Sequence, residues 1–95
     1  MNDLAFAPYY CGDLEPILKF RCQFPTAALW PSLILSGSEN QVIIEWNEFL
    51  IGKFCLLGNY FESGGEKLKS PTDEALRAAI SRKIQEVRNG TQEIK

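Results

Sequence analysis

Residues 49–61 read FLIGKFCLLGNYF, and this stretch decides which fold the chain can form. From Phe49 to Leu57 successive side chains alternate between two faces, and both faces are largely apolar. A strand with two apolar faces is typical of the interior of a sheet, where each face is covered. We therefore predict a central strand over residues 49–57, with Gly52 as the position where a β-bulge would shift the alternation.

Segments on the N-terminal side show the pattern of further strands. Residues 18–24 alternate apolar and polar side chains, so a half-buried strand is expected there, starting after Pro16. Residues 33–35 and 42–46 are rich in β-branched and aliphatic side chains, and turn-forming residues lie between them. These segments provide the neighbours that a central strand requires.

The turns, the loop and the N-terminal arm around these strands can also be predicted. Asn47 and Glu48 are expected to form a two-residue turn into the central strand. Residues 58–69 contain three glycines and are expected to form a loop, or a short strand at Tyr60–Phe61 followed by a turn. Residues 1–13 lack a clear period and are expected to form an arm that packs its aromatic side chains onto the rest of the chain.

The C-terminal third has the pattern of an amphipathic helix over residues 70–89. Ser70 is expected to cap the helix, and Pro71 suits the first helical position. Asn89 and Gly90 are expected to end it. Its apolar stripe recurs at spacings of three and four residues and comprises Leu76, Ile80, Ile84 and Val87.

The helix stripe must be buried, and the face of the predicted sheet is the surface available to cover it. The sequence therefore predicts an α+β fold, in which a small antiparallel sheet of three to four strands packs against one C-terminal helix as a two-layer sandwich. At 95 residues the chain is expected to form a single domain, 1–95. Within it, residues 1–13 are the arm, 14–61 are mainly strands and 70–89 are the helix.

Charge and hydropathy restrict the kinds of partner. The net charge is −2 and the pI is about 5.1, which argues against nucleic acid, because its binders usually carry a basic surplus. Nucleic-acid binding is kept as an alternative that would depend on the basic residues Lys67, Lys69, Arg77, Arg82, Lys83 and Arg88. The N-terminus lacks a signal-peptide pattern, and no run reaches the roughly 20 apolar residues of a membrane span. With an odd number of cysteines, a cytoplasmic setting without a membrane partner is expected.

The absence of histidine limits the available chemistry. Ser-His-Asp and Cys-His catalysis are excluded within this chain. The three cysteines are too far apart in sequence for a typical metal-ligand pattern, so we expect no metal, no cofactor, no catalytic residue and no enzymatic activity. Cys11 is the expected exposed thiol, whereas Cys22 and Cys55 are expected to be small core side chains.

The eleven aromatic residues are more than one sheet face and one helix can cover. Because tyrosine and tryptophan are enriched at the centres of protein interfaces, we expect a partner-binding surface formed by Tyr9, Tyr10, Trp30 and Tyr60. The alternative is that Tyr9, Tyr10 and Trp30 cover the second sheet face of their own molecule. The acidic charge balance favours a partner with a basic surface, and a homodimer would satisfy both interpretations.

These observations predict a non-enzymatic protein-binding or accessory module that acts by occlusion. A second hypothesis is a small-ligand module, with a pocket between sheet and helix lined by Phe20, Phe49, Phe54 and Cys55.

Residues 70–86, SPTDEALRAAISRKIQE, resemble the C-terminal helix of small proteins of unknown function encoded by phages and prophages. The positions that match in kind are Ser70, Pro71, Thr72, Ala75, Arg77, Ala78, Ile80 and Lys83. The resemblance covers under a fifth of the chain. The resemblance implies an origin in a mobile element and no particular activity. An inhibitor or immunity-type protein is a role that would fit the acidic charge balance.

Overall fold

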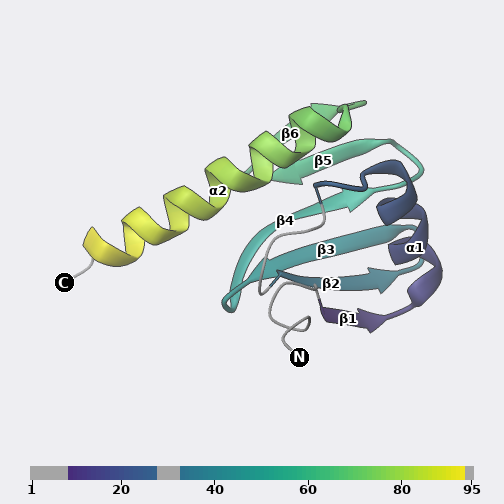
Figure 1. The fold of residues 1–95 in the computed structure, drawn as a ribbon, viewed down its shortest axis with the longest axis horizontal. Helices are drawn as coiled ribbons and strands as arrows, with labels where there is room; N and C mark the ends of the chain where they lie inside the picture. Colours follow the sequence, from purple (N-terminus) through teal and green to yellow (C-terminus); the bar gives the residue numbers. More distant parts are fainter. Residues whose placement is uncertain (1–8, 28–32, 94–95) are drawn as a thin grey trace.

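The computed structural model describes residues 9–27 and 33–93 of the 95-residue chain. The fold is α+β, with a six-stranded sheet and two helices in the described part of the chain (Figure 1). In chain order the elements are β1 (Tyr9–Gly12), α1 (Leu14–Gln23), β2 (Leu33–Ser38), β3 (Gln41–Trp46), β4 (Phe49–Cys55), β5 (Tyr60–Ser63), β6 (Glu66–Lys69) and α2 (Asp73–Glu93).

The strands lie in the sheet in the same order as in the sequence, from β1 at one edge to β6 at the other (Figure 1). The β1–β2 pair is parallel, and α1 provides its crossover, as parallel neighbours require. Every later pair is antiparallel. The sheet is therefore mixed and has six strands, more than the three or four antiparallel strands expected. Strands β1 and β6 were expected as an arm and a loop, and β5 only as an alternative to a loop.

Residues 14–23 form a helix, so the prediction of a strand over 18–24 is wrong. The helix buries Ile17, Phe20 and Phe24, which recur at spacings of three and four, whereas Leu18 is 56 % exposed. Proline is tolerated at Pro16 because the first helical turn has no internal partner for its N–H. Leu18 and Cys22, the other apolar members of the alternating pattern, are exposed on the helix.

The C-terminal helix is present, but both ends differ from the prediction. The Thr72 hydroxyl accepts a hydrogen bond from the Ala75 N–H at 3.0 Å, so Thr72, rather than Ser70, is the N-cap. Ser70 adopts a positive φ of 45° outside the helix. At the other end, the helix continues through Gly90 to Glu93 instead of stopping at Asn89.

Strand β4 contains the irregularity expected near Gly52. Ile44 pairs with Gly52 and Glu45 pairs with Leu50, so Ile51 is an extra residue in β4. Beyond this bulge Phe54 faces the buried side of the sheet, and Lys53 and Cys55 face the other side.

Both helices lie on the same side of the sheet and share one core. Phe54 of β4 contacts Phe20 and Phe24 of α1, with ring centroids 5.5 and 4.9 Å apart. The stripe of α2 joins the same cluster through Leu76, Ile80 and Ile84. Contrary to expectation, the two helices of the described residues cover only one face of β4. The side of the sheet that carries Phe54 is called the covered face, and the opposite side the open face.

Candidate functional site

The strand register determines which side chains form the open face. Cross-strand partners share a face, so the pairing defines three rows that run across the sheet. The first row is Tyr9, Ile34, Glu45 and Leu50. The second row is Cys11, Ser36, Ile43, Lys53, Glu62 and Lys67. The third row is Ser38, Gln41, Cys55, Tyr60 and Lys69.

Apolar side chains gather at one end of the open face. Tyr9 lies beside Ile34, and Ile43 is the diagonal neighbour of both Ile34 and Leu50. Tyr9 is 53 % exposed and Leu50 is 62 % exposed. We call Tyr9, Ile34, Ile43 and Leu50 the apolar patch. A solvent-open hollow of about 410 Å³ begins at Ile43 and Leu50 and extends toward the turn between β5 and β6.

The four residues expected to bind a partner do not form one surface. Tyr9 and Tyr60 lie on the open face, but they are separated by four strand spacings, roughly 20 Å. Tyr10 follows Tyr9 in the same strand and therefore points to the covered face, where it packs against the core. Trp30 lies outside the described residues. The apolar patch retains Tyr9 and adds aliphatic residues that the sequence analysis did not select.

The four residues expected to line a ligand pocket are also not brought together. Phe20 and Phe54 are fully buried, and their rings pack directly against each other. Cys55 lies on the open face, and Phe49, at the start of β4, is 45 % exposed. These four residues do not enclose a pocket. Cys22 was likewise expected in the core, but it is exposed on α1, whereas Cys11 is exposed as expected.

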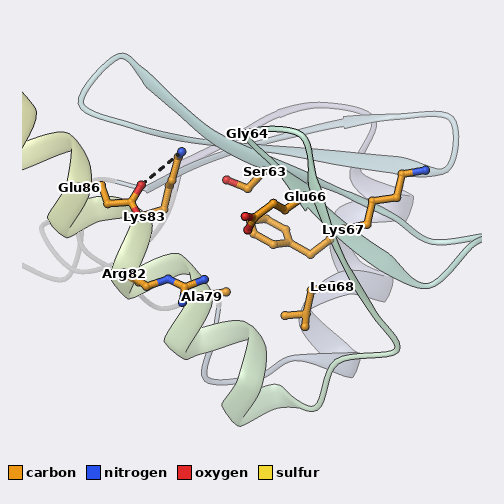
Figure 2. A pocket seen from close by; sticks show the side chains of 10 residues that line it. Ser63, Gly64, Glu66, Lys67, Leu68, Ala79, Arg82, Lys83 and Glu86 are labelled. Carbon is orange, nitrogen blue, oxygen red and sulfur yellow. Dashed lines mark ion pairs between the residues drawn. The ribbon is translucent and has the colours of Figure 1, made fainter.

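A groove does exist between the sheet and α2, but other residues form it (Figure 2). It is about 290 Å³ in volume and lies between the β5–β6 hairpin and the helix. Phe61 and Leu68 form its sheet side, and Ala79 and Arg82 its helix side. We call it the edge groove, because β6 is the last strand of the sheet.

Lys83 lies where the edge groove meets the hollow of the open face, and it lines both. Its Nζ is 3.6 Å from Glu86 Oε1, and its side chain is 29 % exposed (Figure 2). A Cβ on Gly64 would lie 3.3 Å from this Nζ, so the amine rests close above the hairpin turn. Gly64 and Gly65 both adopt positive φ, which glycine allows at little steric cost.

The basic residues do not form one continuous face. By strand register Lys67 and Lys69 lie on the open face, and Lys67 also lines the edge groove together with Arg82 and Lys83. Glu66 and Glu86 lie among the groove cations. The nucleic-acid alternative requires one continuous basic face, and these carboxylates interrupt the cations of the groove.

Tyr60 and Cys55 form a polar pair in the third row of the open face. They are direct cross-strand partners, and Lys67 Nζ lies 4.8 Å from the Tyr60 ring centroid, within cation–π range. The hydrogen bond with the Cys55 side chain and the nearby charge of its thiolate raise the pKa of Tyr60.

Within residues 9–27 and 33–93 no group of three or more Cys, Asp or Glu side chains is arranged to hold a metal ion. None of the helices in this part of the chain combines the length and hydropathy required to cross a lipid bilayer. No family model, curated protein or solved structure matches the chain.

Proposed function

We propose that this protein is a non-enzymatic protein-binding module that acts by occlusion, with the open face as its contact surface. The observation that carries the proposal is the apolar patch, in which Tyr9, Ile34, Ile43 and Leu50 adjoin on a sheet face that neither described helix covers. Exposed apolar groups that adjoin in this way are typical of protein interaction sites.

The rest of the open face suits a polar rim. Lys53, Glu62 and Lys67 follow the patch along the second row. The third row combines the half-buried Gln41, Cys55 and Tyr60 with the exposed Ser38 and Lys69. An apolar region bordered by polar groups is common in protein interfaces, and here the polar groups border the patch on one side. A basic partner surface, as the net charge of −2 favours, remains part of the proposal, and Glu45 within the first row is the acidic group best placed to meet it.

The experiment compares two substitutions of the same kind on opposite layers of the molecule. Leu50→Glu places a charge in the apolar patch, and Leu18→Glu places one on α1, where leucine is exposed to a similar extent. Immobilised wild-type and variant proteins are used to capture partners from the source cell, and the captured proteins are identified by mass spectrometry. We expect Leu50→Glu to lose a protein that both wild type and Leu18→Glu retain.

Equal capture by all three proteins would contradict the proposal, as would the absence of any specific partner. Far-UV circular dichroism of each variant checks that the fold is unchanged. Analytical ultracentrifugation of the same three proteins tests the homodimer form of the proposal, in which the second copy is the partner and only Leu50→Glu is monomeric.

A further inference from the structure

The geometry of the edge groove points to a second binding site, separate from the apolar patch: we propose that β6 accepts an extended peptide of alternating acidic and apolar residues as a seventh strand of the sheet. The peptide would lie beside β6 and place its apolar side chains in the edge groove. This is recognition by β-strand addition, in which main-chain hydrogen bonds provide affinity and alternate side chains provide specificity.

The main-chain groups of β6 determine whether a further strand can pair with it. Among the described strands, β6 pairs only with β5. The two-residue Gly64–Gly65 turn makes Ser63 and Glu66 a hydrogen-bonded pair of the β5–β6 ladder. At the other end of the hairpin, the Ser70 N–H donates to the Asn59 carbonyl at 2.7 Å, which agrees with the same alternation of hydrogen-bonded pairs. The intervening residues Lys67 and Lys69 therefore direct their N–H and C=O groups away from β5, toward the free edge.

The side chains beside the free edge of β6 determine which peptide positions should be apolar and which should be acidic. Leu68 shares the covered face with Phe61, so a peptide residue opposite Leu68 points into the edge groove, toward Ala79 and Arg82 (Figure 2). An apolar side chain at this position would contact Phe61, Leu68 and Ala79, which are the apolar part of a lining that otherwise carries polar and charged groups. The neighbouring peptide residues point to the other face, next to Lys67 and Lys69.

Charge complementarity selects acidic side chains at those neighbouring positions. Lys67 and Lys69 would be their direct cross-strand partners, and opposite charges in such pairs are stabilising. A second copy of β6 is disfavoured for the same reason, because it would bring lysines against lysines. Lysine on an edge strand also protects against pairing with unrelated strands, so the site would discriminate against peptides that lack acidic residues.

The first experiment uses short peptides as probes and NMR spectra of the ¹⁵N-labelled protein as the readout. One peptide alternates Glu and Val, the second has the same composition with Glu and Val in separate blocks, and the third alternates Lys and Val. We expect only the first to produce saturable shifts, centred on the amides of Lys67 and Lys69. Shifts centred on the apolar patch, or equal binding of the three peptides, would overturn the proposal.

Two further tests isolate the main-chain hydrogen bonds. Lys67→Ala removes the charge and keeps the N–H, whereas Lys67→Pro also removes the outward N–H, a change that an edge strand tolerates. Since one hydrogen bond is worth about 1 kcal/mol, Lys67→Pro should bind roughly fivefold more weakly than Lys67→Ala. Equal binding by these two variants would overturn the proposal.

Methylation of the peptide's own backbone nitrogens repeats this test with the protein unchanged, so it also covers the case in which Lys67→Pro fails to fold. A methyl group on an amide that faces β6 should abolish binding, and a methyl group on the next amide should not. The Leu50→Glu variant should bind the peptide as wild type does, so failure of this site and failure of the open-face proposal can be distinguished. Dimers of the unliganded protein that Lys67→Pro dissociates would also overturn the proposal, in favour of a second copy at this edge.

Discussion

The carboxylate of Asp73 accepts a hydrogen bond from the Thr26 hydroxyl at 2.6 Å, and this contact joins the start of α2 to the segment that follows α1. The same carboxylate accepts the Ala27 N–H at 3.0 Å and the Thr26 N–H at 3.2 Å. The two helices are therefore linked by polar contacts at the point where both meet the core.

Asp73→Ala should destabilise the protein by about 1–2 kcal/mol, because it leaves the Thr26 and Ala27 donors without this acceptor and removes a favourable charge from the first turn of α2. Glu74→Ala is the matched control, since Glu74 lies in the same turn, is exposed and makes no contact with Thr26 or Ala27 in the hydrogen bonds described. Urea unfolding of both variants measures the difference. Equal losses for the two would show that only the helix dipole matters.

Acid should weaken this link in a defined direction. Burial alone would raise the pKa of Asp73, but the hydrogen bonds from Thr26 and Ala27, together with the charge of Arg77, outweigh it and lower the pKa. The stabilising effect is therefore fully present above the unfolded-state pKa, about 3.9, and is lost as pH falls through the lower pKa of the folded state.

The unfolding free energies of wild type and Asp73→Asn measure this effect. Their difference should be constant above about pH 5 and should shrink below about pH 4. Solvent screening keeps the change modest, because the carboxylate is only half-buried. A difference that stays constant across the acid range would contradict the assignment.

Two glycine-to-alanine substitutions should change stability in opposite directions. A Cβ on Gly52 would lie 2.6 Å from both the Glu62 carbonyl oxygen and the Phe61 ring, so Gly52→Ala should cost about 1–3 kcal/mol. Gly90 lies within α2 with open space around its Cα, so Gly90→Ala should stabilise the protein by up to about 1 kcal/mol. Thermal unfolding of the two variants provides the comparison, and a neutral Gly52→Ala would contradict the close packing of β4 against β5.

Removing the Cys55 side chain should change the ionisation of Tyr60. Since the hydrogen bond with Cys55 is the largest cause of the raised pKa, Cys55→Ala should bring the pKa of Tyr60 down toward its ordinary value. The ¹³C chemical shift of the Tyr60 ring, followed against pH, measures this. Cys22→Ala, at an exposed cysteine on α1, is the control and should leave the Tyr60 titration unchanged.

The interior of the fold was largely predictable from the sequence. Strands β2 to β5 coincide with runs of β-branched and aromatic residues, and the Asn47–Glu48 turn occurs where it was expected. The apolar stripe of α2 is long enough that its spacing fits a helix and does not fit a strand. For these elements local pattern and tertiary packing favour the same structure.

Three elements could not be obtained from local pattern. Phe20 and Phe24 fit an alternating strand and a helical stripe equally well, and only the burial of Ile17 in the assembled core separates the two. Strand β6 contains a single apolar residue, Leu68, so no alternation of apolar and polar residues can be recognised in its sequence. Strand β1 is defined by its parallel pairing with β2, and because β2 is distant in sequence, a local pattern cannot reveal this pairing.

The candidate site was missed for the same reason. Adjacent residues of a strand face opposite sides, so Tyr9 and Tyr10 could belong to one surface only outside a strand. Ile34 and Leu50 adjoin Tyr9 and Ile43 only after β1 is placed and the bulge at Ile51 is known. The paired glycines at 64–65 were the available signal for the edge groove, because such a pair favours a tight hairpin over a loop.

The position of β1 has a consequence for any shortened form of the chain. Residues 9–12 occupy the outer side of β2, whose first residues are the aliphatic run Leu33, Ile34 and Leu35. A fragment that begins after Gly12 would leave β2 as an edge strand whose aliphatic run carries no charged residue. Edge strands of this kind favour pairing between molecules and aggregation into fibrils. Residues 9–12 thus protect the edge of β2, and proteolytic cleavage near Asp13 is expected to make the protein prone to aggregation.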